Sequence, residues 1–418
     1  MNKKLQFFTL LLVNIFSISS LQAAIDMQAH LATDEAQNAY TSYLSQQSSY
    51  YTGNYTYTTL LAQTGDQLFG SLNTLMGNTC KLEAWGLDYG DLRYAYTDVD
   101  RDLNKSGNII GYYDGYSFAG KWDSGNTWNR EHTWPQSKGA NKDIPMGHDM
   151  QSVRPTRKAA NSDRGNTAYG EGGSYYDPDE ISINNSAYKK INLGTYRGDA
   201  ARVIMYDYIV YGQAGSYKNS LYNGNAQLLN KLGSSGVFES LRIMLKWHMQ
   251  DPPSLTEMVR NDGAQAYQGN RNPFIDFPEF AIQIFLNNSN IKTHKVKVNT
   301  SATLWPNYQY TLSDGFIAYL TEADGSRPES VDVTGATFSY DATMGRLIIT
   351  NVTSDMVIST NGTTAIDDIY YSNKIVIYNI TGTIIAEISS ENLSSTLQTL
   401  PSGLYIIQQG NQARKIMR

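Results

Sequence analysis

The stretch NREHTWPQS, Asn129–Ser137, places an arginine, a carboxylate and an imidazole side by side as Arg130, Glu131 and His132. It has the pattern of a strand that ends early, because Pro135 fixes its own φ angle. Adjacent side chains of a flat strand point to opposite faces. We therefore expect Glu131 and His132 to share one site only where the backbone bends or the strand ends.

A second block, GHDMQSVRPTRKAANSDRGN at Gly147–Asn166, is rich in basic residues. From Arg130 to Arg164 the chain has seven basic and four acidic residues, which leaves +3 in a chain of net charge -6. A local positive field of this kind attracts anionic substrates, although a solvated charged surface is the ordinary alternative. The candidate contacts of this cluster are Arg154, Arg157, Lys158 and Arg164.

Histidine is the simplest general base near neutral pH, and the chain has five histidines. His132 and His148 lie in the two blocks described above. The chain has no HExxH zinc motif, no GxSxG nucleophile elbow and a single cysteine, Cys80. These absences argue against a zinc protease, a serine hydrolase and an internal disulfide.

The blocks NREHTWPQS and NSDRGN resemble the bacterial endonuclease I family, secreted or periplasmic nucleases with a ββα-metal (His-Me finger) core. Three further pieces support the resemblance: GDAARVIMYDY, WHMQDPPSLTEMVRN and QGNRNPFIDFPE. The resemblance implies an α+β fold in which surrounding helices enclose a ββα-metal core. It also implies a phosphodiester hydrolase that acts on nucleic acid.

Residue by residue, the resemblance makes His132 the general base and makes Glu131 and Asn161 the ligands of one metal ion. Mg²⁺ is expected, with Mn²⁺ or Ca²⁺ as possible substitutes, because a hard cation held by few protein oxygens keeps most of its waters. Arg130 is expected to face the phosphate. No motif decides which other arginine contacts substrate. The sequence departs from the family at Gln151 and Ser152, where a histidine and an asparagine are usual.

Each of these residues also has an ordinary structural interpretation. Glu131 alone would be an exposed carboxylate paired with Arg130, and His132 a surface histidine. Asn161 would be a helix N-cap, a position that asparagine favours. The joint pattern favours the catalytic interpretation.

The chain divides into four expected regions. Residues 1–24 have the charged start, apolar run and small-residue end of a signal peptide. Residues 25–290 form the catalytic domain, with helices expected over 36–46, over 64–77 and over 236–250, the last ended by Asp251-Pro252-Pro253. Residues 292–362 predict an antiparallel β module of unknown role, followed by a second, smaller all-β module at 366–418.

The second β module resembles the C-terminal sorting domain of type IX secretion cargo through VIYNITGTII, LPSGLYII and the basic end ARKIMR. This resemblance implies export across an outer membrane, with the secretion machinery as a partner. No segment after the leader is apolar for long enough to span a bilayer.

Together these observations predict a secreted, monomeric, Mg²⁺-dependent endonuclease that cuts DNA and RNA. No zinc finger, homeodomain or RNP motif is present, so contacts to phosphate and sugar are expected to dominate. Two alternatives stay open. One is an extracellular ribonuclease of the same family, and the other is a catalytically inactive surface protein that binds nucleic acid.

Overall fold

The computed structural model describes most of the chain outside its N-terminus. The described residues are 34–82, 84–166, 169, 180–183, 189–192, 196–211, 241–288, 291–322, 326–361, 374–379, 384–389, 392–401, 403–409 and 412–417. The expected signal peptide, residues 1–24, lies outside these ranges. Within them, no helix has both the length and the apolar character needed to cross a bilayer.

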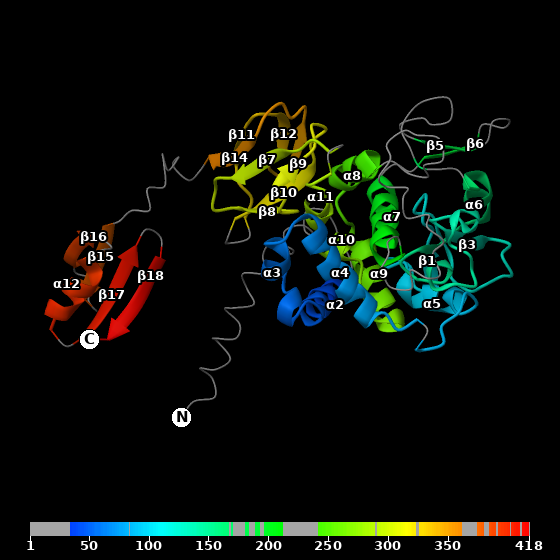
Figure 1. Ribbon diagram of the computed structural model, residues 1–418, viewed down its shortest axis with the longest axis horizontal. Helices are drawn as coiled ribbons and strands as arrows, with labels where there is room; N and C mark the ends of the chain where they lie inside the picture. The colour runs from blue at the N-terminus through cyan, green and yellow to red at the C-terminus, as the bar shows by residue number, and fades with distance from the viewer. Residues whose placement is uncertain are drawn as a thin grey trace. The chain divides into compact units, whose positions relative to one another are not determined.

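Helices and strands are both present (Figure 1). The helices are α2 (Asp34–Tyr50), η1 (Gly53–Tyr55), α3 (Tyr57–Leu61), α4 (Gly65–Thr79), α5 (Leu92–Val99), η2 (Gln136–Lys138), η3 (Pro145–Gly147), α6 (Lys158–Arg164), α7 (Arg197–Tyr211), α8 (Leu241–Gln250), α9 (Leu255–Gln268), α10 (Pro273–Asp276), α11 (Phe280–Ile284) and α12 (Leu393–Thr399). The strands are β1 (Asn108–Ile110), β2 (Ser117–Ala119), β3 (Trp128–His132), β4 (Val153–Arg157), β5 (Glu180–Ile183), β6 (Lys189–Asn192), β7 (His294–Val298), β8 (Thr303–Trp305), β9 (Tyr310–Thr311), β10 (Ile317–Thr321), β11 (Ser330–Thr334), β12 (Thr337–Asp341), β13 (Arg346–Thr350), β14 (Met356–Asn361), β15 (Lys374–Asn379), β16 (Ile384–Ser389), β17 (Leu404–Gln409) and β18 (Gln412–Met417).

The helices expected from apolar periodicity are confirmed as α2, α4 and, over residues 241–250, α8. The first residues of the third expected helix, 236–240, lie outside the described ranges. Helix α8 ends at Gln250, directly before the Asp-Pro-Pro sequence. Helix α9 then begins with a capping box, in which Ser254 and Glu257 each satisfy the other's backbone N–H. Helix α7 is buried from Gly198 to Tyr211 and packs against α4, α8 and α10.

Strands β3 and β4 and helix α6 form a compact ββα unit. The two strands are antiparallel, with Glu131 opposite Arg154 and His132 opposite Val153. Helix α6 starts directly after β4 and ends at Arg164. The next residue, Gly165, caps the helix with a positive φ of 55°, which glycine adopts without strain. The unit thus brings the two sequence blocks together, so that the end of β3 lies beside α6.

The strands β7 to β14 form two four-stranded sheets, in the orders β12-β13-β10-β8 and β11-β14-β7-β9. The expected strands are present, but the module is not wholly antiparallel, because β14 pairs with β7 in parallel. A parallel pair needs a long connection between its strands. Here residues 299–355, which contain most of the module's strands, connect β7 to β14.

This β module shares its core with the helices that precede it in the chain. One continuous apolar cluster contains Leu245 of α8 together with Tyr308, Phe316 and Leu347 of the module. The expected boundary at residues 290–292 therefore coincides with no break in the core. The chain instead divides after residue 362, into a first compact unit at 1–362 and a second at 363–418.

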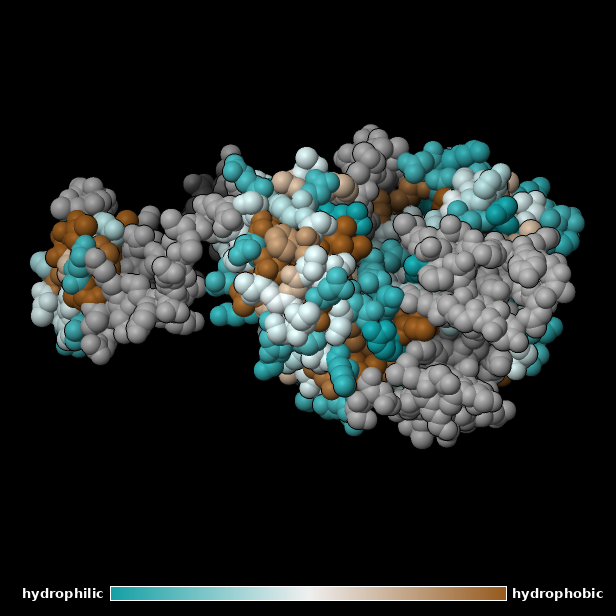
Figure 2. Space-filling model, turned by 90° about the horizontal axis from the view of Figure 1, so that it is seen from above, coloured by the Kyte–Doolittle hydropathy of each residue, from teal (hydrophilic) through white to brown (hydrophobic). Residues whose placement is uncertain are grey.

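The second unit is a four-stranded antiparallel sheet in the order β16-β15-β17-β18. It also contains helix α12, so the expectation of an all-β module is wrong on this point. Ile375, Ile377 and Tyr405 belong to its own small core. Ile384 and Ile385 on β16 are 51% and 43% exposed, and Figure 2 shows hydrophobic side chains at the surface of this unit.

His248 on α8 makes the stability of the first unit dependent on pH. The ring is fully buried, its Nε2 lies 2.8 Å from the Pro278 carbonyl oxygen, and burial followed by Arg202 lowers its pKa to about 3. An unfolded chain protonates this histidine below a pH of about 6.5. Between those values the unfolded state binds more protons, so the contribution is complete above pH 6.5 and is lost as pH falls toward 3.

We predict that His248→Gln flattens the dependence of unfolding free energy on pH between 4 and 6.5, by up to about 1.4 kcal/mol per pH unit. Urea unfolding of both proteins at several pH values measures the two slopes. Equal slopes would show that His248 is not the group responsible.

Candidate active site

A polar pocket of about 310 Å³ lies where β3 ends beside α6. Four residues singled out from the sequence, Arg130, Glu131, His132 and Asn161, all line it. The remaining lining residues are Tyr89, Trp122, Asn129, Pro135, Gln136, Gly165 and Asn166. The ββα unit thus gathers a base, a carboxylate, an amide and a guanidinium around one space.

Glu131 and His132 reach the same pocket because they are the last two residues of β3. The strand ends at His132, and Pro135 follows with a φ of -60°. The site therefore lies at the strand end, which is one of the two arrangements that the sequence allows.

Glu131 is 3% exposed, and only one of its two carboxylate oxygens accepts hydrogen bonds from the described residues. Its Oε1 accepts a hydrogen bond from Arg164 Nη1 at 3.0 Å and another from the Tyr113 hydroxyl. Its Oε2 makes no hydrogen bond within the described part of the chain. Burial raises the pKa of Glu131, and Arg164 and Tyr113 act in the opposite direction. A cation at Oε2 would favour the ionised form in the same way.

Arg164 joins the end of α6 to the end of β3. It is fully buried and donates to the backbone carbonyls of His132 at 3.0 Å and Thr133 at 2.9 Å, in addition to Glu131. Its guanidinium also lies 4.8 Å from the Tyr169 ring centre. Because Asn161 precedes Arg164 by three residues on the same helix, this anchor sets where Asn161 lies along the pocket.

His132 is 6% exposed and faces the pocket as a neutral ring. Neither imidazole nitrogen makes a hydrogen bond of ordinary geometry within the described residues. Burial lowers the pKa of His132 to about 4, with Arg130 and Arg164 acting in the same direction and the Ala140 backbone opposing them. An unprotonated imidazole at neutral pH can accept a proton.

Arg130 lies on the aromatic side of the pocket. Its guanidinium carbon is 3.7 Å from the Tyr89 ring centre and 5.2 Å from that of Trp122, and its Nη1 donates to the Tyr89 carbonyl. No ion pair joins Arg130 to Glu131 among the described residues. No carboxylate in the described ranges pairs with Arg130, so its positive charge at the pocket wall is not neutralised by one.

Oxygen donors suited to a hard cation are present. Glu131 and Asn161 both line the pocket. Neither Glu131 Oε2 nor the Asn161 side chain makes a hydrogen bond among the described residues, so both can offer an oxygen to a cation. No group of three or more histidine, cysteine, aspartate or glutamate side chains in the described chain could hold a metal. A cation here would be held by few protein ligands, as Mg²⁺ usually is.

Two of the expected substrate-binding residues are buried and have partners within the fold. Arg164 is fully committed to Glu131 and to backbone carbonyls, as described above. Arg154 is 5% exposed, lies 3.6 Å from Asp100 and stacks on Tyr112 at 4.6 Å. Neither lines the pocket, so in this structure neither presents its charge to the space beside His132.

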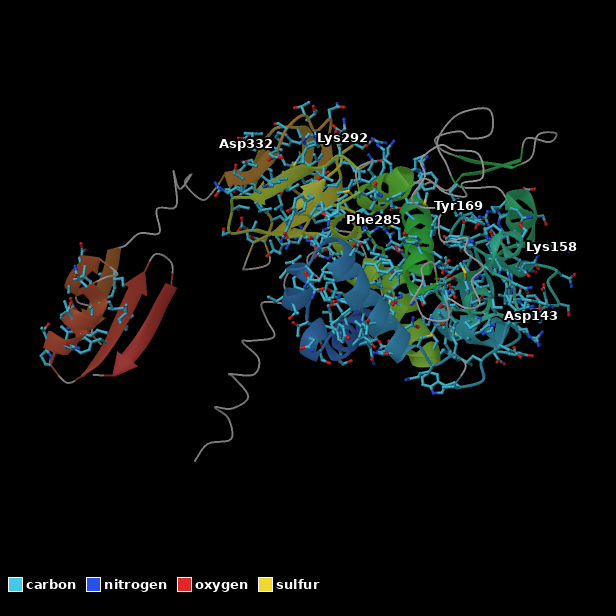
Figure 3. All side chains as sticks on the ribbon, viewed as in Figure 1. Asp143, Lys158, Tyr169, Phe285, Lys292 and Asp332 are labelled. Atoms are coloured by element: carbon cyan, nitrogen blue, oxygen red, sulfur yellow. The ribbon has the colours of Figure 1, made fainter. Side chains whose placement is uncertain are left out.

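The other two basic residues lie at the surface, outside the pocket lining. Arg157 pairs with Asp114, whose carboxylate offsets the charge of the guanidinium. The Arg157 guanidinium carbon also lies 5.2 Å from the Tyr116 ring centre. Lys158 is exposed at the start of α6, toward the outer edge of the unit in Figure 3. A substrate that extends beyond the pocket could reach Lys158.

Sequence reasoning missed Tyr89 and Tyr113. Both precede the NREH block by many residues and belong to no motif, so only the folded chain brings them to Arg130, His132 and Glu131. The block around Asp149 is buried instead of lining the site. Asp149 accepts hydrogen bonds from the hydroxyls of Tyr206 at 2.7 Å and Tyr211 at 2.6 Å, and Gln151 donates to Asn261 at 2.7 Å.

The arginines can be told apart by stability. Arg164→Met should cost about 3–5 kcal/mol of unfolding free energy, because it leaves Glu131 buried without its cation. Arg157→Met is the matched control and should cost less than about 1 kcal/mol, because its side chain is 44% exposed. Urea unfolding measures both. A similar cost for the two variants would contradict the anchoring role of Arg164.

Comparison with known proteins agrees with this geometry. The family model described as Endonuclease I matches residues 64–279, which include the whole pocket lining. An extracellular ribonuclease of Bacillus subtilis (strain 168) is 31% identical over 239 residues, and one of Bacillus amyloliquefaciens is 31% identical over 238. Each match covers 53% of this chain and 75% of the relative. With the family's residues gathered in one pocket, this chain belongs to the endonuclease I family and is a nuclease that hydrolyses phosphodiester bonds.

Proposed function

We propose that this nuclease is a secreted, Mg²⁺-dependent endonuclease that cuts DNA and RNA without reading sequence. The observation that carries the proposal is the gathering of Arg130, Glu131, His132 and Asn161 around one pocket of about 310 Å³. The β3–β4–α6 arrangement has the order of elements expected of a His-Me finger.

His132 acts as the general base in this proposal. Its ring is neutral, lines the pocket and has both nitrogens unoccupied by hydrogen bonds of ordinary geometry within the described residues. One nitrogen takes a proton from the attacking water, whose oxygen bonds to phosphorus. The ester P–O bond on the far side then breaks, and the leaving sugar oxygen takes a proton from solvent water. Arg130 lies two residues earlier on the same strand and therefore on the same face. Its positive charge attracts the phosphate and offsets the charge that develops there.

Glu131 and Asn161 would hold the metal ion. Mg²⁺, when bound there, supplies positive charge that stabilises the developing negative charge on the phosphate. Arg164 and Tyr113 bind the Oε1 side of Glu131 and thereby leave Oε2 toward the pocket. Arg164 also sets the position of α6, and hence of Asn161, relative to the end of β3.

The residues at and near the pocket are consistent with an enzyme that distinguishes neither DNA from RNA nor one base from another. Arg130 and Lys158 offer charge to phosphates, and phosphate contacts carry no sequence information directly. Preference for RNA is a second candidate, because both relatives named above are extracellular ribonucleases. Relative cleavage of DNA and RNA of matched sequence separates the two, and comparable rates support the broader activity. All four residues expected to carry catalysis and metal binding line the pocket, which argues against a catalytically inactive binding protein.

Secretion is supported by the leader-like N-terminus and by the names of the two extracellular relatives. The compact unit at 363–418 is suited to act as a secretion signal domain that is cleaved off after export, because it has its own small core. The secretion part of the proposal fails if the protein accumulates inside cells with its leader and C-terminal unit intact.

His132→Ala should lower the cleavage rate by about 10²- to 10⁴-fold, because the general base is lost. Plasmid nicking and RNA cleavage under single-turnover conditions measure the effect. The matched control is His148→Ala, which removes a histidine that does not line the pocket. If His132→Ala folds and cuts within a few-fold of the control, His132 is not the base.

Removal of divalent metal by EDTA should stop cleavage, and Mg²⁺ or Mn²⁺ should restore it. Asn161→Ala should raise the Mg²⁺ concentration needed for half-maximal rate by about 10-fold or more, whereas Asn161→Asp should retain tighter metal binding because it keeps an oxygen ligand. Calorimetric titration of Mn²⁺ without nucleic acid gives an independent measure. Full activity in excess chelator would overturn the metal-dependent mechanism.

A further inference from the structure

Tyr89 touches both functional residues of the β3 face. Its ring centre lies 3.7 Å from the Arg130 guanidinium carbon and 5.2 Å from the His132 ring centre, with the two rings inclined by only 29°. The Tyr89 backbone carbonyl also accepts a hydrogen bond from Arg130 Nη1. One residue therefore contacts the charge and the base together.

The loop that carries Tyr89 has a defined conformation. Asp91 Oδ2 accepts from the Asp88 backbone N–H at 3.0 Å, and Asp88 Oδ1 accepts from that of Asp91 at 3.2 Å. Upstream, the Lys81 N–H donates to the Gln268 carbonyl at 2.6 Å. Downstream, the loop leads directly into α5, whose buried face packs on α9. Tyr89 is thus attached at both ends to the helical part of the nuclease.

Arg130 and His132 have few other constraints. Trp122 lies on the Arg130 guanidinium at 5.2 Å and is itself packed against Trp128 with ring centres 4.7 Å apart. The Ala140 backbone approaches His132 closely enough to act on its pKa, but neither ring nitrogen makes a hydrogen bond of ordinary geometry among the described residues. An imidazole without such a bond relies on ring packing for its orientation, and Tyr89 supplies the stacked ring.

We propose that Tyr89 is a positioning residue for catalysis, which holds the Arg130 guanidinium and the His132 imidazole in their relative places. The inference rests on the proposed function, because it takes His132 as base and Arg130 as the phosphate contact. The Tyr89 side chain contacts Arg130 and His132 through its aromatic face, whereas the backbone hydrogen bond to Arg130 does not depend on the side chain. The phenolic oxygen is not required.

The test compares Tyr89→Phe, Tyr89→Leu and the control Tyr94→Leu. Tyr94 is 64% exposed, its ring carries Arg93 at 5.0 Å, and it does not line the pocket. Tyr89→Leu should lower kcat/KM by about 10- to 100-fold, with the larger share in kcat, because misplaced catalytic groups lose transition-state stabilisation. Tyr89→Phe should restore activity to within about 3-fold of wild type, since the aromatic face is kept.

A double-mutant cycle with Arg130→Gln separates positioning from general support of the fold. If Tyr89 acts through Arg130, the combined loss in Tyr89→Leu/Arg130→Gln is smaller than the product of the single losses. Tyr89→Met takes the place of the leucine variant if urea unfolding shows that the latter is unfolded. Additive effects, or a Tyr89→Leu rate equal to that of Tyr94→Leu, would overturn the inference.

The result is also distinguishable from failure of the proposed function. An active His132→Ala variant removes the proposed base, whatever Tyr89 does. An inactive His132→Ala variant beside an unimpaired Tyr89→Leu variant leaves the mechanism intact and removes only the positioning role.

Discussion

The buried contact between Arg164 and Glu131 is the constraint on which the site depends. Glu131 is a carboxylate almost without solvent, and such a group needs a partner to remain charged. Arg164 supplies that partner while it also binds the carbonyls of His132 and Thr133. One guanidinium thus fixes the end of β3, one face of the carboxylate and the last turn of α6. The open oxygen of Glu131, the imidazole of His132 and the amide of Asn161 then border one pocket.

The remainder of the first unit supports this arrangement through buried polar contacts as well as apolar packing. Arg202 donates to both Glu257 oxygens at 2.7 Å, and Arg271 donates to both Asp276 oxygens at 2.8 Å. Each is fully buried, so removal of one partner would leave an uncompensated charge. The β module adds Tyr308 and Phe316 to the same apolar core. It is therefore part of the nuclease body, and its removal would expose that core.

Sequence could predict what depends on local pattern. Three features were recognisable in this way: the NREH block, the early strand end at Pro135 and the helix that stops before Asp251. The two family motifs also indicated that Glu131, His132 and Asn161 belong to one site. Positive charge was misleading, because a run of basic residues does not reveal which are buried. Arg154 and Arg164 face carboxylates and carbonyls inside the fold, whereas Arg130 faces the pocket. Tyr89 and Tyr113 come from distant segments, and the parallel pairing of β7 with β14 depends on long-range packing, so neither has a local signature.

The central claim is that the open oxygen of Glu131 and the amide oxygen of Asn161 share one metal ion beside His132. Anomalous scattering from crystals of the protein soaked in Mn²⁺ tests it most directly. We predict one strong peak in the pocket, in contact with Glu131 and Asn161, which disappears in Asn161→Ala crystals grown and soaked in the same way. A pocket without a peak in crystals of protein that cleaves DNA in the same Mn²⁺ solution, or a peak held by other residues, would contradict the account.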